Sequence, residues 1–291
     1  MTRCRIMGDV IPGLPLDKLL EFIKEDAPFG DITSSLVLPD IDVSAVIIAR
    51  QGGIVSGLSE AEQLFSYYGV ETGIPKNDGT AVNPGDILMT LFGPVKAVLL
   101  VERTALNIIG RMSGISTKTK QFIDIVGATG AQCRISSTRK TAPGLRVLDK
   151  KAVQLGGGEA HRFSLSDGIL IKDNHLAIVS LHDAIAIARS GSAYRKVEVE
   201  VETPDQAVLA AKAGADIILL DNMTPGEVEH TLSMLEDHDL RKGRLIEISG
   251  SINDENVEKY ALPGVDIISI GILTHSVRNF DVSLELVKNR V

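Results

Sequence analysis

The sequence predicts an α/β protein whose second half forms a β/α barrel. Six short apolar runs in that half are mostly separated by helical patterns, which is the alternation typical of parallel sheets. Each run ends in a polar or glycine cluster. The repeats share no sequence signature, so the periodicity indicates a barrel rather than a solenoid.

The first half of the chain predicts a smaller α/β layer of its own. A short helix over 16–25 is stopped by Pro28 and Gly30. The turn at Pro84 and Gly85 leads into a strand. The expected elements are the helices 16–25 and 59–68 and the strands 44–57, broken at 52–53, and 87–92.

A mostly apolar helix over 97–109 follows, with Glu102, Arg103 and Asn107 as its polar exceptions. A helix that is apolar on most faces is buried, so we expect this one between domains or subunits. Ser113 and Gly114 predict a break before a second helix over 117–126.

The β/α alternation begins near residue 131. Pro204 and Pro225 suit the first turns of helices, and Gly214 suits the end of one. The expected strands are 131–137, 168–171, 196–201, 215–220, 244–248 and 266–270. The expected helices are 148–155, 181–189, 204–213, 225–235 and 254–260. In a parallel barrel the ligand lies at the carboxyl ends of the strands, so the polar clusters there should converge on one mouth.

Composition excludes several classes of protein. No apolar run approaches the roughly 20 residues of a membrane span, and residues 1–15 lack the apolar core of a signal peptide. Cys4 and Cys133 have no CxxC spacing, which argues against a disulfide framework or a zinc cluster and favours a reducing cytoplasm. Tryptophan is absent and aromatic residues make up 4%, so stacking on nucleic-acid bases is not expected.

The net charge of −8 is unevenly distributed. Residues 103–172 contain 12 Lys and Arg against four Asp and Glu, a local net charge of +8, which leaves −16 for the remainder. One basic block in an acidic protein favours a small anionic ligand, because the surrounding surface would repel a long polyanion.

Five cationic side chains stand out in and after the basic strand-end motif Thr138 to Arg146. Arginine can hold a carboxylate with two parallel hydrogen bonds, and lysine supplies a point charge. Taken alone, this loop could be a solvated basic face. Five cationic side chains near one cleft require an acceptor with more than one negative charge. The five are Arg139, Lys140, His161, Arg162 and Lys172.

Acidic residues mark two neighbouring strands. If Val197, Val199 and Val201 point into one layer, then the three glutamates at 198, 200 and 202 share the other face. A divalent metal or the adjacent hydroxyls of a ribose would satisfy such carboxylates, although an exposed edge strand would also explain them. Asp221 ends the next strand, and the small residues Ser249 to Ser251 and Gly271 expose backbone N–H groups suited to a phosphate.

These motifs resemble those of the quinolinate phosphoribosyltransferase family. The matching stretches occur in family order over nearly the whole chain. They are GDIT (30–33), ERTALN (102–107), SGIST (113–117), TRKTAPGLR (138–146), GGGEAHR (156–162), LIKDNH (170–175), VEVEVE (197–202), LLDNM (219–223) and LTHS (273–276).

The resemblance implies an N-terminal α/β sandwich domain over residues 1–112, with 277–291 packed back on it. An incomplete β/α barrel would occupy residues 113–276. The implied reaction belongs to NAD biosynthesis and joins quinolinate to phosphoribosyl pyrophosphate, giving nicotinate mononucleotide, pyrophosphate and CO₂. The implied enzyme is a dimer that could assemble further, in which Arg103 of one subunit completes the site of the other.

The resemblance also assigns the site residues. Arg139, His161, Arg162 and Lys172 would hold the quinolinate carboxylates, and Lys140 would lie near both substrates. Glu200 and Asp221 would hold the ribose hydroxyls and Mg²⁺. The 5-phosphate would lie against Ser249, Gly250 and Ser251 and against the segment from Gly271 to His275.

Three positions depart from the family pattern: Lys151 often corresponds to Tyr, Ala160 to Asn, and Ser251 to a second Gly. Three alternatives to the main interpretation stay open. They are a nicotinate phosphoribosyltransferase on the same fold, the molybdenum-associated paralogue of the family, and a non-enzymatic binding module. The third rests on the strand 87–92, which resembles those of lipoyl-type domains but lacks a lysine at a hairpin tip.

Overall fold

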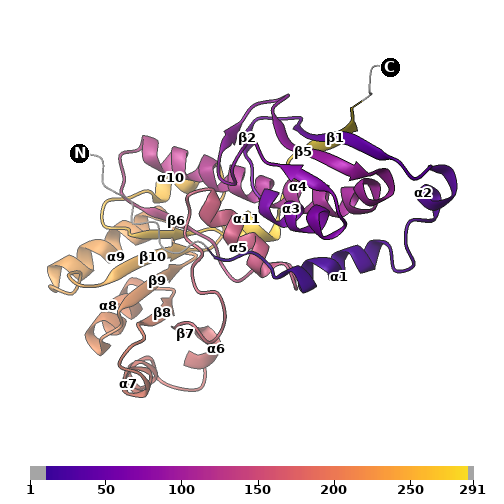
Figure 1. The fold of residues 1–291 in the computed structure, drawn as a ribbon. Helices are drawn as coiled ribbons and strands as arrows, with labels where there is room; N and C mark the ends of the chain where they lie inside the picture. The colour runs from indigo at the N-terminus through magenta and orange to yellow at the C-terminus, as the bar shows by residue number, and fades with distance from the viewer. Residues whose placement is uncertain (1–10, 288–291) are drawn as a thin grey trace. The chain divides into compact units, whose positions relative to one another are not determined.

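The structure is a computed structural model that describes residues 11–287 and divides the chain into two compact units (Figure 1). Within the described residues, the first unit comprises 11–120, 142–157 and 277–287. The second comprises Gln121–Thr141 and Gly158–Ser276. None of the helices described is both long and apolar enough to cross a bilayer.

An antiparallel four-stranded sheet forms the centre of the first unit, in the order β12-β1-β5-β3. Alternate residues of β1 are buried, including Ala45, Ile47 and Ala49, so one face of the strand packs on the core. The strands of this unit are β1 (Asp42–Ala49), β3 (Glu71–Gly73), β5 (Ile87–Pro94), β12 (Val282–Leu286) and the separate pair β2 (Gly53–Ile54) and β4 (Ala81–Val82).

Helices complete the core of the first unit. Leu19 and Ile23 of α1 are buried one turn apart, and the Asp31 carboxylate caps α2 by accepting from Ser34 N at 3.0 Å. The helices are α1 (Leu16–Asp26), α2 (Ile32–Val37), α3 (Leu58–Tyr67), α5 (Arg146–Leu155) and the first part of α4 (Val95–Ala128).

Helix α4 continues without a break through residues 113 and 114, so the predicted interruption is wrong. The small residues there serve packing instead. The Ser113 hydroxyl accepts from Ser56 N at 2.9 Å and donates to Ser56 O at 3.0 Å. A Cβ on Gly114 would lie 2.2 Å from Arg278 O. Close approach of other backbone segments, rather than a helix end, therefore explains these residues.

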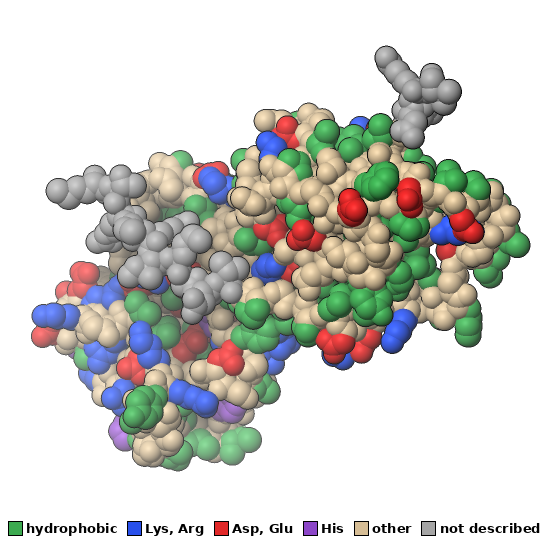
Figure 2. Space-filling model, in the orientation of Figure 1, with side chains coloured by type: hydrophobic (Ala, Val, Ile, Leu, Met, Phe, Trp, Pro, Cys, Tyr) green, Lys and Arg blue, Asp and Glu red, His purple; other side chains and the backbone are tan. Residues whose placement is uncertain are grey.

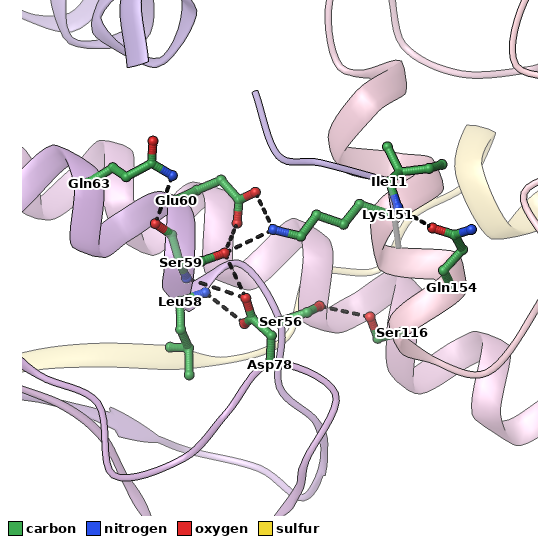
Figure 3. A network of polar contacts seen from close by, with 10 residues as sticks. All are labelled: Ile11, Ser56, Leu58, Ser59, Glu60, Gln63, Asp78, Ser116, Lys151 and Gln154. Carbon is green, nitrogen blue, oxygen red and sulfur yellow. Dashed lines mark hydrogen bonds and ion pairs between the residues drawn. The ribbon is translucent and has the colours of Figure 1, made fainter. Parts of the chain in front are cut away.

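Residues 142–157 group with the first unit, although their sequence lies within the predicted barrel segment. Two ion pairs join residues 142–157 to the rest of the first unit. Arg111 Nε donates to Asp149 Oδ1 at 2.7 Å, and Lys151 Nζ lies 2.7 Å from Glu60 Oε1. Figure 3 shows the second pair, with the Ser59 hydroxyl beside it. The family boundary expected near residue 112 falls inside α4.

Six parallel strands form the second unit, in the order β6-β11-β10-β9-β8-β7. The sheet ends at β6 and β7, which confirms the expected incomplete barrel. The strands are β6 (Arg134–Ser136), β7 (Ile169–Ile171), β8 (Val197–Val201), β9 (Ile217–Asp221), β10 (Leu245–Ser249) and β11 (Ile267–Ser269).

Helices link these strands, and Figure 1 shows α7, α8 and α9 side by side along the sheet. Thr203 and Thr224 cap α8 and α9, each with proline in the first turn, as their sequences predict. The helices are α6 (Asp173–Leu176), α7 (Leu181–Gly191), α8 (Pro204–Ala213), α9 (Pro225–Asp237), α10 (Val257–Tyr260) and α11 (Ile272–His275). The expected helix 254–260 is therefore shortened to its last turn.

Candidate active site

A cavity of about 430 Å³ opens at the carboxyl ends of the parallel strands. All of its lining residues belong to the second unit. They are Thr138, Arg139, Lys140, His161, Arg162, Leu170, Lys172, Glu200, Leu219, Asp221, Asn222, Glu247, Ser249, Gly250, Ser251 and Ser269. The parallel topology is what gathers them, because successive strands end on the same edge of the sheet.

Two arginines in this lining present donors without acceptors. The Nε atoms of Arg139 and Arg162 are buried and have no hydrogen-bond partner among the described residues. Burial and the neighbouring Arg139 charge lower the pKa of Arg162. Two half-buried guanidinium groups in one cavity are stabilised by an anionic ligand, and carboxylates match their geometry.

His161 lies against two buried carboxylates. Its Nε2 is 3.2 Å from Glu247 Oε1 and 3.6 Å from Glu198 Oε1, and the Ser269 hydroxyl donates to Glu247 Oε1 at 2.5 Å. Burial alone would lower the pKa of His161, but the adjacent carboxylates of Glu198 and Glu247 raise it to about 9. The imidazole is therefore protonated at neutral pH.

Carboxylates from neighbouring strands form the acidic part of the cavity. Glu200, on β8, forms an ion pair with Lys172, which follows β7. Asp221 ends β9, where burial and the Glu200 charge raise its pKa. Glu198, on β8, is buried, and Val197, Val199 and Val201 of β8 pack into the core. Strand β8 lies between β7 and β9, so it is not the exposed edge strand of the alternative interpretation.

A tight turn after β10 is joined to the end of β9. Asn222 N donates to Ser249 O at 2.9 Å, and its side-chain Nδ2 donates to Asp221 Oδ2 at 2.7 Å. Gly250 has a φ of +104°, and a Cβ there would lie 2.3 Å from Asn222 Oδ1. Only glycine therefore fits under the Asn222 amide, which ties Asp221 to the Ser249–Ser251 turn.

Two family models together match most of the chain. The model of the quinolinate phosphoribosyl transferase C-terminal domain matches residues 115–285, and that of the N-terminal domain matches residues 31–113. The chain belongs to the quinolinate phosphoribosyltransferase family.

Individual relatives support this membership over nearly full length. The chain is 43% identical to the probable nicotinate-nucleotide pyrophosphorylase (carboxylating) of Methanothermobacter thermautotrophicus, covering 93% of this chain and 98% of that protein. It is 37% identical to the nicotinate-nucleotide pyrophosphorylase (carboxylating) of Mycobacterium leprae, over 93% and 96% of the two chains. The structure of the Francisella tularensis nicotinate-nucleotide pyrophosphorylase superposes with a TM-score of 0.88, at 32% identity and with 96% and 99% coverage.

Of the residues that the family resemblance singled out, ten line the cavity. Gly271 and His275 do not line the cavity, but Gly271 lies close to Lys140, which does. A Cβ on Gly271 would lie 3.1 Å from the His275 ring and 3.4 Å from Lys140 Cδ. Arg103 lies on α4 in the first unit, is exposed, and is also absent from the lining.

The sequence analysis did not identify Glu247 and Ser269 as parts of the lining, whereas Thr138 and Asn222 belong to polar strand-end clusters that it expected there. Glu247 had a usable signal, because a lone carboxylate within the apolar stretch 245–248 is as unexpected in a core as those of β8. Ser269 is a short polar residue at the end of β11, for which the sequence offers no comparable contrast.

The donor set of Glu200 and Asp221 fits a hard divalent cation. Both are carboxylates, they come from adjacent strands, and each lines the cavity. A cation between them would also offset the charge repulsion that contributes to the raised pKa of Asp221. His161, Glu198 and Glu247 form a second group of potential ligands within 4.8 Å of one another, but the protonated imidazole already neutralises part of that charge.

Proposed function

We propose that this chain is a decarboxylating phosphoribosyltransferase that converts quinolinate and phosphoribosyl pyrophosphate to nicotinate mononucleotide, pyrophosphate and CO₂ in NAD biosynthesis. The observation that carries the proposal is one cavity that combines unpaired arginine donors with two carboxylates from adjacent strands. Quinolinate has two carboxylates, which match the excess of cationic groups. The ribose becomes positively charged during the reaction, and the carboxylates of Glu200 and Asp221 would stabilise that charge.

Quinolinate would bind to the cationic part of the cavity. The unpaired Nε atoms of Arg139 and Arg162 are positioned to donate to its carboxylates. Lys172 would add a third charge after exchanging its ion pair with Glu200 for the ligand. This exchange would also free Glu200 for the ribose, so binding of the first substrate would prepare the site for the second.

Glu200 and Asp221 would act on the second substrate. As pyrophosphate leaves, positive charge develops on the ribose, and fixed carboxylates stabilise it more in the transition state than in the ground state. The two residues would also hold Mg²⁺, which would screen the charge of the leaving pyrophosphate. The backbone N–H groups of Ser249, Gly250 and Ser251 would receive the 5-phosphate.

Once the pyridine nitrogen is bonded to the ribose, the ring carries a positive charge. Loss of the carboxylate next to the nitrogen then leaves an electron pair that this charge stabilises. The protein's task at this step is to orient the ring and to exclude water. Neither step needs a covalent nucleophile.

We further propose that the enzyme is a homodimer with shared active sites. Arg103, Asn107 and Arg111 recur at intervals of one helical turn on α4, and Arg103 and Asn107 are exposed. Exposed apolar side chains also occur in and just before α2, where Leu36 is 81% exposed and Phe29 is 97% exposed. Figure 2 shows apolar surface at this helix. A second copy would cover these surfaces and place Arg103 at its partner's cavity. We also propose a cytoplasmic location; within residues 11–287, Cys133 is a free cysteine.

A single-turnover experiment tests the proposed activity. Quinolinate labelled in the carboxylate next to nitrogen is mixed with enzyme, Mg²⁺ and phosphoribosyl pyrophosphate, and released CO₂ and pyrophosphate are measured. One CO₂ and one pyrophosphate per turnover are expected. Calorimetric titration should show tighter binding of quinolinate than of nicotinate. Equal affinity for the two acids, with no CO₂ released, would support a nicotinate phosphoribosyltransferase instead.

A further inference from the structure

The proposed reaction leaves one chemical requirement without an assigned residue. When the carboxylate next to the ring nitrogen departs as CO₂, the bonding electron pair stays on ring carbon C2. Nicotinate mononucleotide carries hydrogen at that carbon, so a proton must be supplied. The site has to exclude bulk water, and a side chain in the lining is therefore the natural donor.

Few of the groups that line the cavity can give up a proton. Guanidinium groups such as those of Arg139 and Arg162 do not deprotonate in proteins. The Lys172 ammonium would be paired with a quinolinate carboxylate at this step, and Lys140 is exposed to solvent. His161 remains, and imidazole is the side chain that most often transfers protons near neutral pH.

The surroundings of His161 distinguish its two ring nitrogens. Nε2 faces Glu247 Oε1 at 3.2 Å and Glu198 Oε1 at 3.6 Å, both on buried side chains. The hydroxyl of Ser269 holds Glu247 from the next strand. By contrast, Nδ1 has no hydrogen-bond partner among the described residues.

The backbone also fixes this arrangement. His161 has a φ of +55°, in the left-handed region that side-chain-bearing residues rarely adopt. Its neighbours Glu159 and Ala160 accept from Ser136 and Ser137, which ties the segment to the end of β6. Strain of this kind persists where the surrounding structure holds it, and it is concentrated at functional sites.

We propose that His161 is the acid that protonates C2 after decarboxylation, and that Glu198 and Glu247 are the positioning residues that reserve its Nδ1 proton for this step. The inference rests on the proposed function. The bond from C2 to the carboxylate breaks and CO₂ leaves. The electron pair on C2 takes the proton from Nδ1. His161 becomes a neutral imidazole that keeps its Nε2 proton toward Glu247, and water restores the Nδ1 proton after the product departs.

Two matched variants test the role of Nδ1. In His161→Asn, the amide nitrogen takes the approximate place of Nδ1 and asparagine tolerates a positive φ, but an amide is no acid. His161→Gln places its amide nearer the position of Nε2. Circular dichroism and quinolinate titration establish that each variant folds and binds its substrate.

The readout is the partition between the two chemical steps in a single turnover. At quinolinate concentrations that saturate the His161→Asn variant, we expect formation of nicotinate mononucleotide to fall by about 100-fold or more relative to pyrophosphate release, the usual contribution of a general acid. The nucleotide that still carries both carboxylates should accumulate, and mass spectrometry would detect it. Equal losses in pyrophosphate and mononucleotide, or no loss in either, would overturn the proposal.

Glu247→Gln provides the second test, and it does so without removing the imidazole. It should slow mononucleotide formation by about 10-fold or more while sparing pyrophosphate release, because the carboxylate that orients the ring is lost. If pyrophosphate release and mononucleotide formation slowed equally, Glu247 would have only a structural role, and its positioning role would be contradicted. If wild-type enzyme releases neither CO₂ nor pyrophosphate, the proposed function itself fails, and that outcome is distinct from both variant results.

Discussion

Replacing Lys151 with methionine would leave Glu60 as an uncompensated charge in the core of the first unit. The Glu60 side chain is fully buried, and that of Lys151 is 11% exposed. Lys151 Nζ lies 2.7 Å from Glu60 Oε1 and donates to the Ser59 hydroxyl at 2.9 Å, as Figure 3 shows. Breaking a buried pair by removing one partner costs about 3–5 kcal/mol of stability.

The double variant Glu60→Gln with Lys151→Met should recover part of this loss. It removes both charges and keeps a side chain of similar length at each position. Because replacing both members of a buried pair is often close to neutral, we expect it to be more stable than Lys151→Met alone by about 1–3 kcal/mol. Lys18→Met is the matched control, since Lys18 pairs with Glu21 on the surface and should contribute about 0–1 kcal/mol.

Hydrogen exchange read by mass spectrometry suits this comparison, because it reports the opening free energy of individual segments in a chain of two units. Amides of α3 and α5 should lose protection in Lys151→Met, while those of β8 to β10 should change little. The reasoning would be refuted if Lys151→Met were no less stable than Lys18→Met. It would also be refuted if the double variant lost more stability than Glu60→Gln and Lys151→Met lose when their separate losses are added.

Substitutions at the proposed active site should separate binding from turnover. Arg139→Ala should weaken quinolinate binding by about 2–5 kcal/mol, measured calorimetrically, without changing the fold. Asp221→Asn should lower kcat far more than quinolinate affinity, because its charge matters most when the ribose becomes cationic. Gly250→Ala should displace Asn222 and raise the KM for phosphoribosyl pyrophosphate, since strain at a positive φ costs about 1–3 kcal/mol. Arg103→Ala should be inactive alone, yet mixing it with Arg139→Ala should restore about a quarter of wild-type activity through hybrid dimers.

Each of these expectations has a clear contrary result. Unchanged quinolinate affinity in Arg139→Ala would remove that residue from the carboxylate site. Normal turnover in Asp221→Asn would contradict its ribose role, and an unaltered KM in Gly250→Ala would show that the turn tolerates a side chain. If activity stays absent after mass spectrometry has confirmed subunit exchange, Arg103 does not serve a partner's site.

Much of the site was predictable because strand ends in a parallel sheet converge whatever the details of the loops. Arg139, Lys172 and Asp221 each follow or end an apolar run, Glu200 is the last residue but one of β8, and all four line one cavity. Glu202 shows the limit of the same reasoning. It continues the alternating pattern of β8 in the sequence, but it lies beyond the end of the strand and is exposed.

The remaining features depend on packing between distant segments. Glycine is compatible both with a helix end and with close backbone approach, and only the position of Arg278 decides for Gly114. Residues 142–157 join the first unit through partners at positions 60 and 111, far away in sequence. The contact of His161 with Glu247 likewise joins residues that no local pattern connects.

The pairing of β12 with β1 bears on how the cell makes this protein. Ala45 is paired with Leu286, so the sheet begun by β1 is completed by a strand that is synthesised after the whole parallel sheet of the second unit. Until then β1 is an unprotected edge, and such edges invite pairing with other chains. The sheet of the first unit therefore lacks β12 while the whole parallel sheet is synthesised. Nonsense or frameshift changes that remove β12 should therefore leave β1 as an open edge and lower solubility.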